Sequence, residues 1–358
     1  FDHDATAADT LALGSGHGND SLSITPTAGL AIVADAGDGN DDVAVNGTAG
    51  ADSITVALNS QTINGLGGQV TLAAAESLSL SGAGGTDDVT VTESGLSSEL
   101  GVVSLTAAAG SSLTVVGTSG DETFGVSPTA AGAGSYSEDG AGPDVDYSGF
   151  DTASTFDGNG GFDVIVVNGN DAADTVTSTA NSVTIKGGAV TLDDLDRLEL
   201  NTGGGDDNVD LDLQDASLEK VVNAGTGNDI VDASGAIDAT INGGDGDDNL
   251  VGSPVADLIN GQGGDDTIGG GDGDDILFGG SGNDVLSGDD GADQLSGQAG
   301  NDDLSGNAGV DSLFGGDGSD EINWISGDGN DVVQGGDGAD VLDVDYTAGA
   351  DTITINSV

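Results

Sequence analysis

The sequence lacks cysteine and methionine, and its basic, histidine and aromatic residues are few. Without cysteine, the chain forms no disulfide and has no thiolate for catalysis. Its two histidines, His3 and His17, lie close together near the N-terminus, and no Ser-His-Asp set can be assembled from motifs. Aromatic residues make up 3% of the chain, which is too little for a sugar-stacking groove. We therefore expect that the protein is not an enzyme.

Positive charge is almost absent, because three basic residues face 64 acidic ones and leave a net charge of −61. Only eight of the acidic residues are Glu, and the other 56 are Asp. Aspartate is typical of turns, where its short carboxylate bonds the local backbone or a metal ion. This charge excludes nucleic acids and anionic membranes as partners and favours multivalent cations. Without such counter-charge, the composition lies close to the disordered class.

Long apolar runs are also missing, so we expect no membrane insertion. The first residues do not form a signal peptide. The chain begins at Phe1 rather than Met, and we expect a processed product or a fragment, with the export signal removed from the chain as it stands.

What the chain does contain is a repeat: nine consecutive nonapeptides run without a gap from Gly243 to Asn323. Position 1 is Gly and position 6 is Asp in all nine, position 8 is always Leu or Ile, and position 4 is Gly except at Val255. Trp324 and Ile325 then interrupt the frame, which resumes at residues 326–343 and fades after 346. A pattern this regular predicts a stack of identical structural units.

These residues resemble the hemolysin-type calcium-binding repeat of the RTX family, over roughly residues 224–354. The resemblance implies a calcium-binding parallel β-roll. The residues agree with it, because each unit combines a six-residue turn with a three-residue strand that has one inward apolar side chain. Two units form a coil of about 18 residues, and coils are expected to stack at roughly 4.8 Å, the spacing between strands.

The turn carries oxygen donors only, from glycine-flanked carbonyls and the position-6 carboxylate. Such a set suits Ca²⁺ ahead of Mg²⁺ or Zn²⁺, so we expect several bound calcium ions. Alternation of the repeats predicts two columns of aspartates on opposite edges. One column holds Asp248, Asp266, Asp284, Asp302 and Asp320, and the other holds Asp257, Asp275, Asp293 and Asp311.

The alternative is that these aspartates only cap turns or keep the surface soluble. It is strongest for Asp257, because Pro254 and Val255 stand where its turn needs glycine. The candidate calcium ligands are therefore chosen from the regular repeats and from isolated turns of similar sequence. They are Asp20, Asp41, Asp87, Asp207, Asp229, Asp248, Asp266, Asp275, Asp284, Asp293, Asp302, Asp311, Asp320, Asp331 and Asp340, with Gly243, Gly261, Gly270, Gly279, Gly288, Gly297, Gly306 and Gly315.

Residues 1–222 form the first of two predicted domains, and residues 223–358 form the second. In the first domain, residues 46–91 match residues 168–211, and a degenerate third copy runs from 117 to 167. Alternating β-branched residues predict strands throughout. We expect an all-β chain in which a wider, irregular β-solenoid stacks on the β-roll to give a rod, with an immunoglobulin-like sandwich as the alternative for the first domain.

Three function classes remain. The first is an extracellular structural protein that Ca²⁺ folds and that assembles with itself, and with other cell-surface components, into a surface layer, matrix or filament. The second is a calcium-binding rod or secretion segment of a larger RTX adhesin or secreted enzyme. The third, ice or carbohydrate binding, needs a regular Thr or aromatic row, and position 9 of the repeats provides none. We favour the first, because nothing in the sequence resembles catalytic chemistry.

Overall fold

The computed structural model describes residues 154–325, 329–345 and 354–355, and before residue 154 it describes Ser111 and a series of short strands. Every regular element in these residues is a β-strand, so the predicted all-β class is confirmed. The described part of the chain contains no helix able to cross a membrane. Two compact units are formed, by residues 1–167 with 186–196 (unit 1) and by residues 168–185 with 197–358 (unit 2).

Unit 1 consists of short strands joined across coils. They are β1 (Asp9–Gly14), β2 (Ser21–Ile24), β3 (Leu30–Asp35), β4 (Asp42–Asn46), β5 (Ser53–Ala57), β6 (Thr62–Asn64), β7 (Val70–Ala73), β8 (Ser77–Ser81), β9 (Asp88–Thr92), β10 (Val102–Thr106), β11 (Ser112–Val116), β12 (Thr123–Ala130), β13 (Ala133–Glu138), β14 (Asp144–Ser148), β15 (Ser154–Asp157), β16 (Val164–Asn170), whose last residues belong to unit 2, and β19 (Gly188–Asp193).

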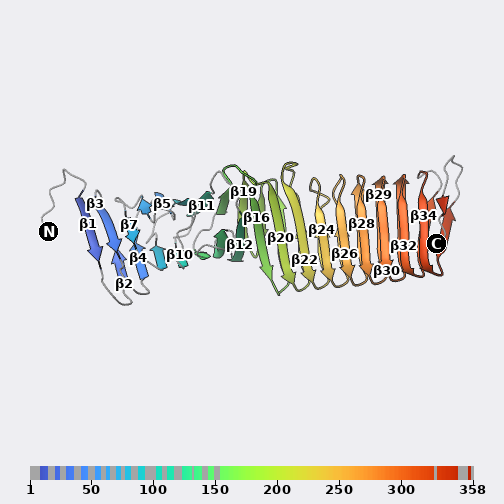
Figure 1. Ribbon diagram of the computed structural model, residues 1–358, viewed down its shortest axis with the longest axis horizontal. Coiled ribbons are helices and arrows are strands. Elements are labelled where there is room, and N and C mark those ends of the chain that lie inside the picture. Colours follow the sequence, from blue (N-terminus) through green and yellow to red (C-terminus); the bar gives the residue numbers. More distant parts are fainter. Residues whose placement is uncertain are drawn as a thin grey trace. The chain divides into compact units, whose positions relative to one another are not determined.

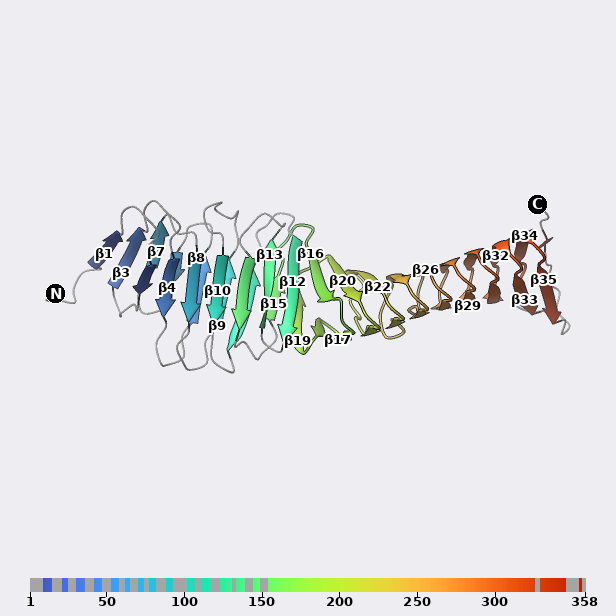
Figure 2. The same cartoon turned by 90° about the horizontal axis from the view of Figure 1, so that it is seen from below.

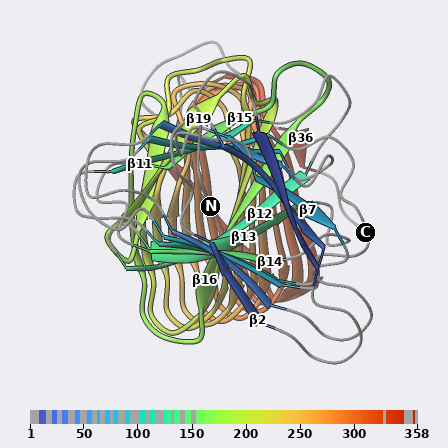
Figure 3. The ribbon, with the colours of Figure 1, turned by 90° about the vertical axis from the view of Figure 1, so that its left-hand side faces the viewer.

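Most pairings between successive coils of unit 1 are parallel (Figure 2). One ladder runs β2–β4–β8–β10–β14 and another runs β5–β9–β11–β15–β19. Figure 3 shows β11, β15 and β19 on one side of the coils and β2 and β14 on the other. The sandwich alternative is therefore wrong for these strands, because an immunoglobulin-like sandwich is antiparallel. The solenoid prediction is confirmed.

The copies of the long internal repeat share one arrangement of strands, in which the first strand of a hairpin also pairs with a strand from the next coil. β5 and β12 each form an antiparallel hairpin with the next strand and pair in parallel with a later one, β9 and β16 respectively. In unit 2, β17 (Thr175–Thr179) does the same with β18 (Ser182–Ile185) and β21 (Asn208–Asp210). Ser53 pairs with Asp88 and Thr175 with Asn208, so the two best copies share one register.

Unit 2 contains two parallel ladders that face each other (Figure 2), and Figure 1 views the same strands face-on. Ladder 1 comprises β17, β21, β23 (Ile230–Asp232), β25 (Asn249–Val251), β27 (Thr267–Asp272), β29 (Val285–Gly291), β31 (Asp303–Gly309), β33 (Glu321–Ile325) and β35 (Val341–Asp345). Ladder 2 comprises β20 (Arg197–Gly204), β22 (Glu219–Thr226), β24 (Thr240–Asp245), β26 (Leu258–Gly263), β28 (Ile276–Ser281), β30 (Gln294–Ala299), β32 (Ser312–Gly318), β34 (Val332–Gly338) and β36 (Thr354–Ile355).

The boundary predicted after residue 222 lies inside unit 2. β20, β22 and β24 pair in one continuous parallel register, so the coils before the nonapeptides belong to the same stack as the nonapeptides. The regular repeat motif therefore starts later in the chain than the two ladders that it extends.

The core of the nonapeptide region is one column of position-8 side chains per ladder. Leu277, for example, pairs with Leu295 of the next coil, and both are fully buried. The other members are Leu250, Ile259, Ile268, Leu286, Leu304, Leu313 and Ile322. Trp324, which interrupts the repeat frame, is also buried in β33, next to Ile322 on the inward side of the strand. Each nonapeptide thus contributes only one apolar side chain to the core, so the stability of the coils depends strongly on the turns.

Candidate calcium sites at the edges of unit 2

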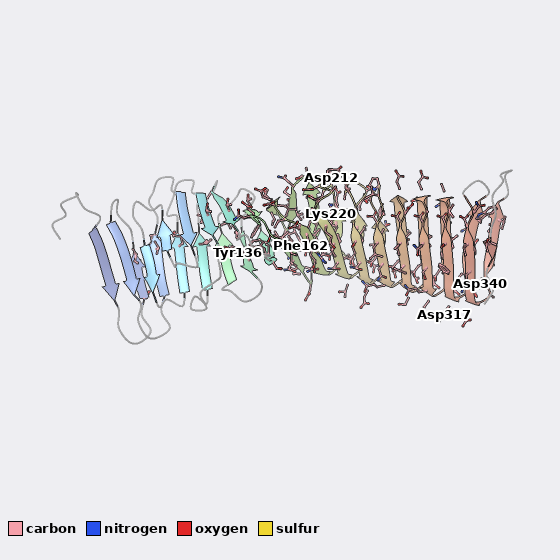
Figure 4. The ribbon with its side chains drawn as sticks, turned by 45° about the horizontal axis from the view of Figure 1, so that its top comes forward. Tyr136, Phe162, Asp212, Lys220, Asp317 and Asp340 are labelled. Atoms are coloured by element: carbon pink, nitrogen blue, oxygen red, sulfur yellow. The ribbon has the colours of Figure 1, made fainter. Side chains whose placement is uncertain are left out.

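Two edges of unit 2 carry the turns, and we name them by the ladder they lead into. Edge A turns precede the strands of ladder 1, and edge B turns precede those of ladder 2. Figure 4 places Asp212 at one edge and Asp317 at the other. Asp317 stands at position 3 of an edge A turn, and Asp212 follows β21 on the way to edge B.

Glycine serves two different purposes in each turn. In the turn 270–275, Gly271 and Gly273 have φ angles of 107° and 135°, a region that only glycine enters without strain. At position 1 the requirement is space: a Cβ on Gly270 would collide with Oδ2 of Asp275 and with the carbonyl oxygen of Gly288. The glycine at position 1 is therefore required for steric reasons. The same collision with the position-6 carboxylate recurs at Gly243, Gly261, Gly279, Gly288, Gly297, Gly306 and Gly315.

The position-6 aspartates form a hydrogen-bonded column along each edge. On edge A, the backbone N–H of Asp266 donates to Oδ1 of Asp284 at 2.9 Å, and the N–H of Asp284 donates to Asp302 at 2.9 Å. On edge B, Asp275 donates in the same way to Asp293 at 2.8 Å. The prediction of two columns is confirmed. Edge A links Asp174, Asp207, Asp229, Asp248, Asp266, Asp284, Asp302, Asp320 and Asp340, and edge B links Asp257, Asp275, Asp293, Asp311 and Asp331.

The second oxygen, Oδ2, of most of these carboxylates is buried and has no hydrogen-bond donor. It points toward the position-1 glycine of its own turn, where a side chain would otherwise lie. A buried carboxylate oxygen without a partner is costly, and native proteins pair such atoms with a donor or a metal. This arrangement is found at Asp248, Asp266, Asp275, Asp284, Asp293, Asp302 and Asp320, whereas Asp207 and Asp229 have an orphan Oδ2 in turns whose position 1 is Thr202 and Ala224.

Burial makes the negative charge of these carboxylates unfavourable. It raises the pKa of Asp248 and of Asp275 from 3.8 to about 7, and neighbouring aspartates add to the effect. The pKa of Asp284 and that of Asp302 rise to about 6 for the same reason. The hydrogen bond to Oδ1 opposes the rise but does not cancel it. The columns are therefore poised to take up positive charge.

The donors present fit calcium. Oδ2 lies beside the carbonyl oxygen of the position-1 glycine one coil further on, as for Asp275 and Gly288, so oxygen atoms of two coils converge. Within the described residues no three carboxylate or histidine side chains form a metal cluster, so an ion in these turns would need backbone carbonyl groups in addition to the position-6 carboxylate. An oxygen-only set dominated by carbonyls suits Ca²⁺. Ca²⁺ would be held by the position-6 aspartates and by carbonyl groups of the glycine turns.

Asp257 differs from the other edge B aspartates. Its Oδ2 accepts the backbone N–H of Ser253 at 2.5 Å, and its Oδ1 accepts the Ser253 hydroxyl at 3.0 Å and the N–H of Ala239 at 2.6 Å. Both oxygens therefore have donors without an ion. The doubt that the sequence raised about this turn has a physical basis, because Ser253 stands at position 2 and Pro254 and Val255 follow it.

The remaining predicted ligands fall into three groups. Asp207 and Asp229, which precede the regular repeats, lie in the edge A column with the same orphan oxygen. Asp331 is buried, whereas Asp340 is exposed and still accepts the N–H of Asp320 at 3.2 Å. Asp20, Asp41 and Asp87 lie outside the described residues, although β2, β4 and β9 begin at the residue that follows each of them.

Position 5 forms a second, exposed column on edge A, which the sequence analysis missed. Asp265 accepts the backbone N–H of Asn283 at 2.7 Å, and Asn283 accepts that of Asn301 at 3.0 Å. Asparagine at some of these positions reduces the repulsion between stacked carboxylates. The full column is Asp206, Asn228, Asp247, Asp265, Asn283, Asn301 and Ser319. The recurrence of Asp or Asn at position 5 is the signal that would have revealed it.

Comparison with known families agrees with this geometry. A family model described as RTX calcium-binding nonapeptide repeat (4 copies) matches residues 242–277, 251–286, 269–304, 287–322 and 325–353. The resemblance inferred from the sequence is thus confirmed over this region, which carries RTX calcium-binding repeats. The first coils of unit 2 lie outside the matches. A search of curated proteins finds no match to the chain.

Proposed function

We propose that the chain is an extracellular structural protein that Ca²⁺ folds and that then associates with copies of itself. The observation that supports calcium-driven folding is the run of buried Oδ2 atoms without donors on both edges. Each nonapeptide buries only one apolar side chain, which does not offset the cost of burying a carboxylate without a partner. Bound ions would remove that cost by neutralising the carboxylates of the turns. Several ions per chain follow from the number of equivalent turns.

Location outside the cell fits the calcium supply. Extracellular calcium modules bind in the range of about 0.1–1 mM, which the outside of a cell provides and the cytosol does not. Proteins with RTX repeats are often secreted. Turns that combine one buried carboxylate with backbone carbonyl groups belong to this weak-binding class, because the ligand charge per site is low.

A calcium titration followed by far-ultraviolet circular dichroism tests calcium-driven folding. The chelated chain is expected to lose strand signal, and millimolar Ca²⁺ is expected to restore it cooperatively. Magnesium chloride at equal ionic strength is the control, because it screens charge without fitting the turns. A chelated protein with the full strand signal would contradict the proposal.

Self-association has two structural features in its favour. The outward side chains at positions 7 and 9 of the ladder 2 repeats, from β26 to β34, are all uncharged, although the chain carries a net charge of −61. They are Leu258, Asn260, Ile276, Phe278, Gln294, Ser296, Ser312, Phe314, Val332 and Gln334. In addition, β36 pairs with β34, and no strand is found beyond it in the described residues. Two copies repel each other least through such surfaces, and an open strand edge recruits partners.

Light scattering in Ca²⁺ tests the association and its surface together. Truncation before Asp351 removes β36, and Phe314→Asp places a charge on the uncharged face. We expect one or both changes to raise the concentration at which particles form. If both variants associate as readily as the unchanged chain, the two surfaces do not mediate association. If the unchanged chain stays monomeric in Ca²⁺, the proposed self-association is wrong. The monomeric outcome would favour the alternative function, a calcium-binding rod or secretion segment of a larger RTX adhesin or secreted enzyme.

We further propose that the protein is not an enzyme. The support is the absence from the sequence of a nucleophile–base motif and of cysteine. Its carboxylates stand in hydrogen-bonded columns along the edges of unit 2, which suits ion binding better than acid–base chemistry.

A further inference from the structure

Lys220 stands in edge B at a position that aspartate takes in later coils. Val221 pairs with Thr240, Thr240 with Leu258, and Leu258 with Ile276. The residues that precede them in the chain are Lys220, Ala239, Asp257 and Asp275. Edge B therefore begins with a lysine in the register of the calcium-binding aspartates.

The ammonium group of Lys220 is enclosed by oxygen atoms. Its Nζ donates to the backbone carbonyl oxygens of Asp215 at 2.7 Å, Leu218 at 2.6 Å and Ile237 at 2.6 Å. The carboxylate of Asp238 lies 3.5 Å away. The lysine side chain is fully buried. All three N–H donors of the ammonium group are thus used, each on a carbonyl.

Three carbonyl oxygens and one carboxylate form the kind of donor set that binds a hard cation such as Ca²⁺. Here a covalently attached cation occupies it. A buried ammonium is tolerated only where its charge is paired and its hydrogens are bonded, and this cage provides both. The two loops that form the cage, residues 211–218 and 233–239, contain no glycine-rich calcium turn.

The next two coils of edge B also need no ion there, because at the position of Lys220 they contain no buried carboxylate oxygen that lacks a hydrogen-bond donor. Ala239 has no carboxylate, and its N–H donates to Asp257. Asp257 receives its remaining donors from Ser253. The first orphan oxygen of edge B is therefore that of Asp275, whereas on edge A orphan oxygens start as early as Asp207.

We propose that the Lys220 ammonium fills the first cation site of edge B and replaces Ca²⁺ there. Edge B is then independent of calcium from β22 to β26, and these strands give the calcium-binding coils a preformed neighbour to stack on. The inference rests on the calcium-binding part of the proposed function and not on self-association.

Hydrogen–deuterium exchange with peptide-resolved mass spectrometry tests this assignment in Lys220→Met, which keeps the length of the side chain and removes its charge. In saturating Ca²⁺, peptides covering β22 and β24 are expected to exchange about tenfold faster than in the unchanged protein, because local opening frees the caged carbonyls. Peptides covering β28 to β32 serve as an internal reference and are expected to stay protected. Lys186→Met is the matched control, since it makes the same charge change away from the cage and is expected to alter neither set of peptides.

Unchanged exchange of β22 and β24 in Lys220→Met would overturn the proposal. If that variant is unprotected throughout, Asp238→Asn replaces it, because it removes only the carboxylate of the cage; a local rise of about threefold supports the proposal and no rise overturns it. In chelator, the unchanged protein is expected to retain more protection in β22 and β24 than in β28 to β32. Equal and full protection of all these strands in chelator would instead contradict calcium-driven folding, so the two failures are distinguishable.

Discussion

The two units stabilise the same kind of coil by different means. In unit 1, Phe124, Tyr136 and Phe156 are fully buried against one another, with ring centroids 5.8 Å apart for the two phenylalanines and 5.5 Å for Tyr136 and Phe156. In the nonapeptide region of unit 2, the core side chains are single Leu or Ile residues. The first unit packs large aromatic surfaces, whereas the second places much of its burial in carboxylates.

The comparison bears on the role that we propose for calcium. A buried aromatic side chain removes about 150–250 Å² from water, far more than one aliphatic side chain per strand provides. A coil whose core contains one leucine or isoleucine per strand buries much less apolar area. Such a coil becomes stable only when its buried carboxylates are neutralised. We therefore infer that dependence on calcium follows the narrowness of the core rather than the acidity of the chain.

The largest expected effect is a selective loss of unit 2 on chelation. Trp324, the single tryptophan, is buried in β33, so its fluorescence reports on the nonapeptide coils. Excess chelator is expected to shift its emission to the red, because the indole becomes exposed as the carboxylates repel each other. The rings of unit 1, followed by aromatic NMR signals or near-ultraviolet circular dichroism, are expected to keep their packing.

The reverse perturbation sharpens the same contrast. Phe156→Ala removes the ring that contacts both Phe124 and Tyr136, and it is expected to destabilise unit 1 by about 3–5 kcal/mol. The calcium concentration at the midpoint of the Trp324 transition is expected to stay the same. A coupled shift of both probes would show that the two units do not differ in the way described.

The next largest effect is the pH dependence of folding in the presence of chelator. Burial raises the pKa of Asp248 and Asp275 to about 7 against 3.8 for an ordinary aspartate, so the folded chain binds protons that the unfolded chain has lost. This contribution is complete below about pH 3.8 and disappears as the pH rises through about 7. Acidification of the chelated protein from neutral pH is thus expected to restore part of the strand signal.

Calcium reverses this dependence, because protons and Ca²⁺ compete for the same carboxylates. The calcium affinity is expected to fall as the pH falls from about 7 to about 5. Calcium titrations at several pH values, followed by Trp324 fluorescence, measure it. An affinity independent of pH would exclude the raised aspartates as ligands.

The smallest effect compares two aspartates within unit 2. Asp284→Ala deletes an orphan carboxylate in the middle of edge A and is expected to weaken calcium binding about tenfold, with fewer ions bound. Asp257→Ala removes hydrogen bonds to Ser253 and Ala239 and is expected to lower stability by about 1–3 kcal/mol without changing the number of ions. Calorimetric titration distinguishes them, and equal losses of bound calcium would mean that Asp257 also holds an ion.

The sequence predicted the edges of unit 2 because the period of nine leaves one register only. With Gly at position 1, Asp at position 6 and Leu or Ile at position 8, alternate repeats must reach opposite edges. The same motif predicted Asp207 and Asp229 as candidate ligands in isolated turns, and the structure adds both to the edge A column. The local residue pattern was sufficient to predict these edges, because each nonapeptide has the same pattern as the one before it.

Other features depend on contacts between distant residues, which a local pattern does not encode. Alternating strands occur in sandwiches and solenoids alike, so only the parallel pairing of unit 1 separates them. Lys220 lies outside the motif, and its place becomes visible once Val221 is paired with Thr240. Ser253 stands at position 2, where the repeat has no fixed residue, and only the structure shows that its N–H and hydroxyl supply donors to Asp257.

The columns of aspartates have a polarity that follows from their hydrogen bonds. In each step the N–H belongs to the earlier coil and the carboxylate to the later one, as from Asp248 to Asp266 and from Asp266 to Asp284. A coil added at the C-terminal side therefore brings an acceptor to a donor that is already fixed in position. In these position-6 columns, growth toward the C-terminus is templated by the backbone, in the order in which a chain is synthesised.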